Sequence, residues 1–171
     1  MPAVRDFRKY SFHPSRVDRC GRDIGSKVYW KLYAIENTIR VVIHSVLSAQ
    51  IGNQWWAAAV DPKIVARAQG IRNSYAAKHQ NANPGSHDIH LVFLKDLTEI
   101  IRANSNLIIS VIPNTNQWIA ALEAIRVPRN LVGHMNFPNA FDRSAIDSAY
   151  SQLPMLLQHL TASNVPIEIP Q

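Results

Sequence analysis

The sequence contains a single cysteine, Cys20, among 171 residues, so no internal disulfide can stabilise the fold. A lone cysteine is typical of a reducing compartment, and we expect a cytoplasmic protein. No set of cysteines and histidines has zinc-finger spacing, and we expect neither a metal nor another cofactor. No run of 18 apolar residues is present either, which predicts that the chain does not span a membrane. The basic N-terminus lacks the apolar middle part of a secretory signal.

Positive charge is concentrated near the N-terminus. The formal net charge is +6 and the isoelectric point is near 9.8, which favours a polyanionic partner. Residues 1–27 contribute +4 of this charge, because seven Arg or Lys residues outnumber three Asp residues. Residues 1–26 also show no clean apolar periodicity, so we interpret them as a basic, partly irregular N-terminal segment. This segment is either a solvated end or an arm that contacts RNA, and both interpretations stay open.

Apolar residues between about 27 and 50 recur at steps of three and four, which predicts one face of a long helix. Capping residues and periodicity predict further helices over about 62–80, 88–103, 114–125 and 142–159. Residues 107–112 are rich in β-branched side chains, but a lone strand would have no partner, so we interpret them as the end of a helical hairpin. The sequence therefore predicts an all-α bundle of about five helices over residues 27–161, followed by a C-terminal tail over 162–171.

One short run, Arg129-Asn130-Leu131-Val132-Gly133-His134, combines side chains that could act on RNA. Asn130 and His134 are four residues apart and share a face of a helix, so the amide can orient the imidazole. Arg129 lies beside that face and can reach a phosphate, while Arg126 adds a second positive charge one turn earlier. Histidine exchanges protons near neutral pH, and arginine binds phosphate. The run therefore suits attack by an RNA 2′-hydroxyl on the neighbouring phosphate.

A proline immediately precedes this run, and its effect on the helix is left open by the sequence. Pro128 must end the preceding helix, kink it, or open a new one. If Pro128 opened a new helix, the free backbone N–H groups of the first turn would point toward the same phosphate.

The spacing of arginine and histidine is not specific by itself. An arginine followed by a histidine after four to six intervening residues occurs three times: Arg8–His13, Arg72–His79 and Arg129–His134. Arg72 and His79 would share a helix face, so this pair remains an alternative site. Its other interpretation is an ordinary solvated polar helix.

An ordered series of landmarks favours the last of these pairs. The series is Tyr33-Ala-Ile-Glu36-Asn37-Thr-Ile-Arg40, Trp55-Trp56, His90-Leu-Val-Phe-Leu-Lys-Asp-Leu97 with Ile100-Ile101, Trp118, and Arg129-Asn130-x-x-x-His134. On these residues, the segment from about Val28 to Leu160 resembles a HEPN domain (higher eukaryotes and prokaryotes nucleotide-binding). It is similar to the subgroup found in a eukaryotic mRNA quality-control endonuclease and in many bacterial proteins.

The resemblance implies an all-α fold paired as a homodimer, in which two motif helices meet across the two-fold axis and RNA is cut without metal. Arg129 would bind the phosphate, His134 would move protons and Asn130 would hold His134. Glu36 and Arg40 would line the cleft, although four-residue spacing also suits an ordinary surface ion pair. The context would be RNA decay, toxin–antitoxin control or defence, with an antitoxin or a larger complex as a further partner.

Two other functions remain open from the sequence. The first is a non-catalytic module that binds RNA or a nucleotide. The second is a helical dimerisation or adaptor domain in which the motif is only a satisfied polar core, so that His134 would be buried.

Aromatic and histidine residues outside the motif have simpler interpretations. Trp55, Trp56 and Trp118 are expected to be packing anchors rather than platforms on which bases stack. His87 and His90 have no third ligand nearby in the sequence, so we do not expect a metal there.

Overall fold

Helices build the whole architecture of the computed structural model, which describes residues 4–78 and 85–171. Within these ranges the structure has no strand, which confirms the predicted all-α class. The elements are η1 (Phe7–Lys9), α1 (Pro14–Ile24), the π-helical turn η2 (Gly25–Tyr29), α2 (Trp30–Ile51), α3 (Trp55–Ala59), α4 (Pro62–Ala76), η3 (Asp88–Leu91), α5 (Leu94–Ala103), α6 (Ser105–Ile109), α7 (Thr115–Gly133), α8 (Ala140–Ser151) and α9 (Leu153–Ala162). Among the described helices, none has the length and apolar character that crossing a membrane requires.

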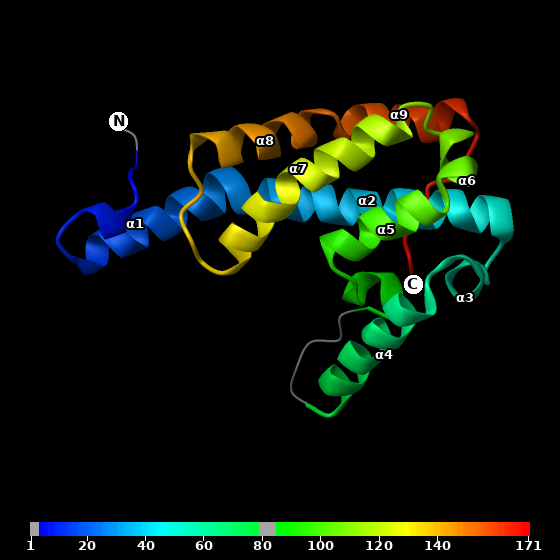
Figure 1. The fold of residues 1–171 in the computed structure, drawn as a ribbon, viewed down its shortest axis with the longest axis horizontal. Helices are drawn as coiled ribbons and strands as arrows, with labels where there is room; N and C mark the ends of the chain where they lie inside the picture. The colour runs from blue at the N-terminus through cyan, green and yellow to red at the C-terminus, as the bar shows by residue number, and fades with distance from the viewer. Residues whose placement is uncertain (1–3, 79–84) are drawn as a thin grey trace.

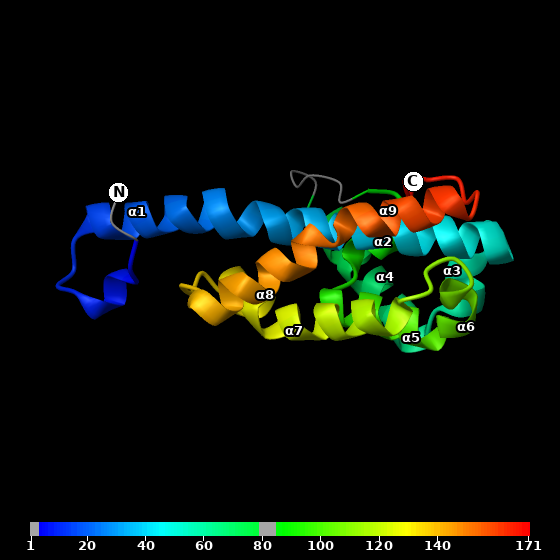
Figure 2. The same cartoon turned by 90° about the horizontal axis from the view of Figure 1, so that it is seen from above.

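The first long helix begins earlier than the sequence predicts. α1, η2 and α2 follow one another without a break and form a rod whose first part, α1, extends beyond the rest of the bundle (Figure 1, Figure 2). The helix begins at Pro14, because the His13 side chain accepts a hydrogen bond from the Ser15 backbone N–H and proline suits a first helical position. Periodicity missed α1 because only Cys20 and Asp23 are buried on it.

The core surrounds α2, which contacts α5, α6, α8 and α9. α7 and α8 run antiparallel to each other, and α7 also packs on α5 (Figure 1). The largest fully buried side chains lie on these elements and include Ile39, Ile43, Leu122 and Ile125. Each such aliphatic side chain contributes about 1.5–3 kcal/mol on burial. This packing fixes α2 and α7 relative to each other, and the motif residues lie on these two helices.

Two predicted elements differ in detail from the structure. The helix expected over 142–159 is two helices, α8 and α9, and Pro154 occupies the first turn of α9, where proline leaves no hydrogen bond unmade. The β-branched segment 107–112 is partly helical, in α6. The C-terminal tail packs back on the bundle, because the Glu168 backbone N–H donates to Ser45 Oγ at 2.9 Å and Val165 is buried.

The turn after α2 depends on a glycine. Gly52 has φ 92° and ψ −174°, a backbone region that is essentially open only to glycine. We therefore expect Gly52→Ala to lower the free energy of unfolding by about 1–3 kcal/mol, measured by chemical denaturation. Gly70→Ala is the matched control. Gly70 lies inside α4 with open space around its Cβ position, so alanine there should stabilise by about 0.5–1 kcal/mol. Equal losses for the two variants would contradict this explanation.

Candidate active site

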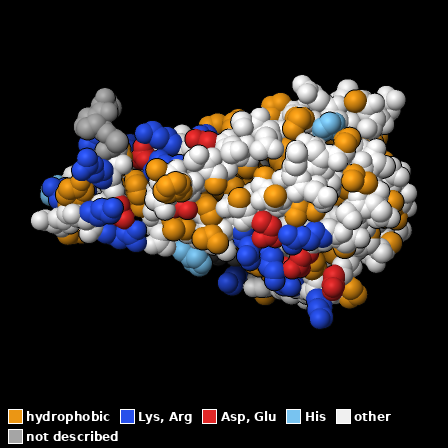
Figure 3. Space-filling view, turned by 45° about the horizontal axis from the view of Figure 1, so that its top comes forward, with side chains coloured by type: hydrophobic (Ala, Val, Ile, Leu, Met, Phe, Trp, Pro, Cys, Tyr) orange, Lys and Arg blue, Asp and Glu red, His pale blue; other side chains and the backbone are white. Residues whose placement is uncertain are grey.

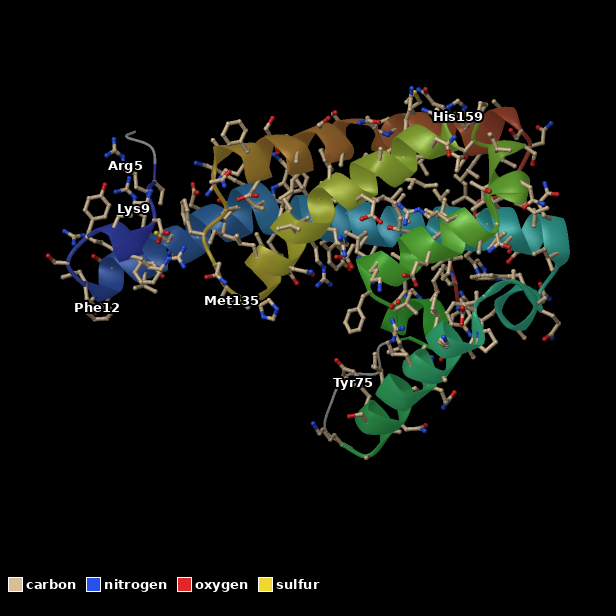
Figure 4. All side chains as sticks on the ribbon, in the orientation of Figure 1. Arg5, Lys9, Phe12, Tyr75, Met135 and His159 are labelled. Atoms are coloured by element: carbon tan, nitrogen blue, oxygen red, sulfur yellow. The ribbon has the colours of Figure 1, made fainter. Side chains whose placement is uncertain are left out.

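A groove of about 1100 Å³ runs between the long helix and the C-terminal end of α7. Its walls come from η1, α1, η2, α2, the last turns of α7 and the loop that follows, and His90 also contributes. Met135, at the start of that loop, lies at the end of α7 nearest the projecting part of the rod (Figure 4). Of the predicted site residues, Glu36, Arg40 and Arg129 line this groove.

Glu36 is the centre of the polar contacts in the groove. Its carboxylate accepts a hydrogen bond from Arg129 Nε at 2.6 Å on Oε1, and another from Arg40 Nη2 at 3.2 Å on Oε2. Arg129 Nη2 lies 3.5 Å from the second oxygen. Glu36 is only 8% exposed, so this carboxylate is a buried anion shared by two guanidinium groups. The structure thus brings together three predicted residues from α2 and α7.

Arg40 is a structural tie between α2 and η3. Its Nε donates to the Ile89 carbonyl and its Nη2 to the Val92 carbonyl, both at 3.1 Å. Burial lowers the pKa of Arg40 from its ordinary value, and the negative charge of Glu36 opposes that shift. Because the guanidinium is buried and its donors are occupied, Arg40 holds the cleft in shape rather than reaching toward a substrate.

Arg129 has one guanidinium edge engaged and one open. Nε and Nη2 contact Glu36, whereas Nη1 has no hydrogen-bond acceptor among the residues that the structure describes. The side chain is 29% exposed, so the open edge is accessible from the groove. A Cβ added at Gly133 would lie 3.7 Å from Nη1, so the room left by this glycine adjoins Arg129. Arg129 is therefore held in place while it keeps a donor for a phosphate oxygen.

His134 caps the C-terminal end of α7 and is exposed. Its backbone N–H donates to the Asn130 carbonyl at 2.9 Å, but no hydrogen bond joins their side chains in the described part of the chain. The predicted orientation of the imidazole by the amide is therefore not present, and α7 ends at Gly133, one residue before His134. The imidazole is exposed, whereas the interpretation of the motif as a satisfied polar core expects it to be buried. His134 is adjacent in sequence to Gly133 and Met135, which line the groove.

Two further expectations about the motif are corrected. Arg126 is exposed and does not line the groove; its Nε pairs with Glu123 at 3.1 Å. Pro128 is buried inside α7 and opens no helix. The motif therefore lies at the C-terminal end of a helix, where backbone carbonyls rather than N–H groups lack helical partners, so no helix start is available to bind the phosphate.

The groove contains residues that sequence reasoning did not select. Arg8, in η1, donates from Nη1 to Asn136 Oδ1 at 3.0 Å, and both residues line the groove. The exposed ring of Tyr33 also lines the groove. No sequence signal could have paired Arg8 with Asn136, because they are 128 residues apart.

Only one residue of the alternative pair, Arg72 and His79, lies within the described residues. Arg72 donates to Asp88 at 2.6 Å and to the carbonyls of Gly85 and Ser86, so it anchors the approach to η3. His79 lies outside the described residues.

A second cluster of rings lies between α2, α3 and η3. Trp55 donates from Nε1 to His44 Nδ1 at 3.2 Å and stacks on His87, with ring centroids 5.3 Å apart. Trp55 and Trp118 are buried, in agreement with their interpretation as packing anchors. Within residues 4–78 and 85–171, no three potential ligand residues are grouped so that they could hold a metal.

This ring cluster should make stability depend on pH. Burial lowers the pKa of His87 to about 4, and the nearby charges of His44, His90 and Arg72 act in the same direction, against that of Asp88. The unfolded chain, with an ordinary histidine pKa near 6.5, binds more protons than the folded chain between these values. We expect the free energy of unfolding to fall as the pH falls from about 6.5 toward 4, and His87→Gln to reduce that dependence, in urea titrations at several pH values. An unchanged slope in the variant would contradict this assignment.

Comparison of the chain with protein-family models, curated proteins and solved structures found no match.

Proposed function

We propose that this protein is a metal-independent endoribonuclease of the HEPN type, with Arg129 and His134 at the reacting phosphate. One observation supports the proposal most strongly. A buried carboxylate fixes Arg129 so that one guanidinium edge opens into a groove, and an exposed histidine follows at the end of the same helix. A fixed arginine that presents a free donor is the arrangement that phosphate recognition needs.

The chemistry would be transfer of the phosphate to the adjacent 2′-oxygen. The 2′-oxygen forms a bond to phosphorus as the bond from phosphorus to the 5′-oxygen breaks, which leaves a 2′,3′-cyclic phosphate and a 5′-hydroxyl. A base takes the proton of the 2′-hydroxyl, and an acid supplies a proton to the departing 5′-oxygen. His134 performs one of these transfers, and Arg129 neutralises the charge on the phosphate.

The second proton-transferring group would come from a second copy of the chain. Each chain carries one motif histidine, whereas acid–base cleavage benefits from two groups. His134 is exposed at a helix end, so a second copy could approach it. The proposal includes this homodimer. It also includes a cytoplasmic location and an antitoxin or a larger complex as regulator.

Binding without cleavage is the second candidate function, and one observation favours it. The Asn130 side chain makes no hydrogen bond to His134 within the described residues, so nothing in a single chain holds the imidazole in one orientation. In that case Arg129 would still bind phosphate, and RNA would be retained intact.

Incubation of the purified protein with RNA and EDTA separates the two candidates. If the protein is a nuclease, fragments that end in 2′,3′-cyclic phosphates should form, and His134→Ala should not produce them. Salt-sensitive binding of intact RNA would favour the binding module. Cleavage that requires an added metal ion would overturn the proposed mechanism.

A further inference from the structure

The projecting end of the rod carries more positive charge than the carboxylates paired with it there neutralise, among the residues that the structure describes. We define the basic arm as residues 4–24, which comprise η1 and α1. It extends beyond the bundle, and basic side chains gather at that end of the molecule (Figure 2, Figure 3). Two arginines of the arm have carboxylate partners: Arg8 pairs with Asp6 at 2.7 Å, and Arg22 with Asp18 at 3.0 Å.

Four cations of the basic arm have no ion pair among the residues that the structure describes: Arg5, Lys9, Arg16 and Arg19. All four are exposed. Unpaired guanidinium and ammonium groups so close together repel one another, and a polyanion would relieve that repulsion. The arm is therefore a surface with charge complementary to a chain of phosphates.

Three of these cations surround one hollow. Arg5, Arg16 and Arg19 line a depression of about 360 Å³ together with the ring of Tyr10. Tyr10 organises the two sides of it, because Arg5 Nη1 lies 3.4 Å from the Tyr10 hydroxyl oxygen and the Arg16 guanidinium lies over the ring, 5.6 Å from its centroid. Tyr10 thus holds two of the guanidinium groups, those of Arg5 and Arg16, around a space that Arg19 also lines, and guanidinium groups suit contacts to phosphate oxygens.

This hollow adjoins the candidate active site. Phe7 and Cys20 line both the hollow and the groove that contains Arg129, so the two spaces lie on either side of the same residues. The arm is also tied to the loop after α7, since Arg8 donates to Asn136. A strand whose phosphate lies at Arg129 can therefore continue directly over the arm.

The exposed apolar groups of the arm are mostly aromatic rings, which suits a single strand of nucleic acid better than a duplex. Tyr10 is 45% and Phe12 is 76% exposed, and Arg5, Lys9 and Phe12 lie at the free end of the arm (Figure 4). Bases of a single strand can stack on such rings, whereas those of a duplex are already stacked.

We infer that the basic arm binds the phosphate backbone of single-stranded RNA as it leaves the groove, through Arg5, Arg16 and Arg19, so that substrate affinity depends on a surface separate from the reacting site. This inference rests on the proposed function for the identity of the polyanion as RNA. It differs from the proposed function in locating affinity on the basic arm rather than on the motif.

The test measures binding apart from cleavage. The full chain is titrated onto a labelled single-stranded 2′-O-methyl RNA of roughly 20 nucleotides, which lacks the attacking hydroxyl and stays intact. Anisotropy is recorded at several salt concentrations. R5Q/R16Q/R19Q should bind about tenfold more weakly at low salt, and its plot of log affinity against log salt should be shallower by about 2, because each single-strand phosphate contact contributes about 0.7.

The matched control removes the same number of charges elsewhere. K63Q/K78Q/K95Q, on and near α4 and α5, should keep the wild-type affinity and salt slope, because these lysines lie outside the arm and the groove. Far-ultraviolet circular dichroism and thermal unfolding verify that both variants fold. F12A should weaken binding to the single strand without changing the salt slope.

Three outcomes overturn the inference. The first is equal affinity and slope for R5Q/R16Q/R19Q and wild type. The second is an equal loss in the lysine control, which would mean that net charge alone acts. The third is that the arm variant loses only binding to vesicles containing phosphatidylserine while RNA binding is kept. Failure of the proposed function appears in a different measurement, as the absence of RNA cleavage with EDTA or as undiminished cleavage by His134→Ala.

Discussion

His134→Ala is expected to lower the rate of RNA cleavage by about 10²–10⁴-fold in the presence of EDTA, while the protein folds normally. The loss follows from removing the group that moves a proton to or from the reacting oxygens. Stability should change by no more than about 0.5 kcal/mol, because the imidazole is exposed and has no side-chain hydrogen bond among the described residues. Initial rates of fragment formation and thermal unfolding measure the two effects.

The matched control is His159→Ala. His159 also lies near the end of a helix, α9, but it does not line the groove, and Figure 4 shows it well away from Met135, which does. The His159→Ala variant should cleave RNA at the wild-type rate. If His134→Ala and His159→Ala had equal activities, the exposed imidazole of His134 would not be the proton-transferring group. If His134→Ala unfolded, the residue would have a structural role that its exposure does not indicate.

The sequence predicted the fold class because periodicity and caps are local signals. The apolar stripe of α2 and the Asp61-Pro62 start of α4 can both be recognised from residues that are close together in the sequence. The start at Pro14 was missed because the apolar stripe of α1 is short, consisting of Val17, Cys20 and Ile24 among many charged residues. A short stripe of this kind is a weaker signal than the long stripe of α2.

The candidate site was predictable in part for the same reason. Glu36, Arg40 and Arg129 were named from motifs, yet the contact between Glu36 and Arg129 spans 93 residues and depends on how α5 and α8, which pack on both helices, place α7 beside α2. The expected bond between Asn130 and His134 assumed that the helix continues through His134, whereas it ends at Gly133. Helix ends depend on the loop that follows, and here that loop contributes a groove wall.

Glu36→Ala should produce the largest loss of stability among the variants considered. The carboxylate is the acceptor for both Arg40 and Arg129, and its removal leaves the Arg40 guanidinium buried without a counter-charge. Breaking a buried ion pair from one side costs about 3–5 kcal/mol, more than an exposed pair contributes. For a chain of this length the midpoint of thermal unfolding should fall by on the order of 10 °C.

Glu99→Ala is the appropriate comparison, because Glu99 forms an exposed pair with Lys95 at 3.4 Å and its loss should cost less than about 0.5 kcal/mol. The loss of stability in Glu36→Gln should lie between those of Glu36→Ala and Glu99→Ala, since an amide keeps one acceptor but removes the charge. Each Glu36 variant should also cleave RNA more slowly, because Arg129 would lose the contact that directs its free edge into the groove. A Glu36→Ala protein as stable as Glu99→Ala would mean that Arg40 finds solvent or another anion, and the buried carboxylate would then not be what holds the groove together.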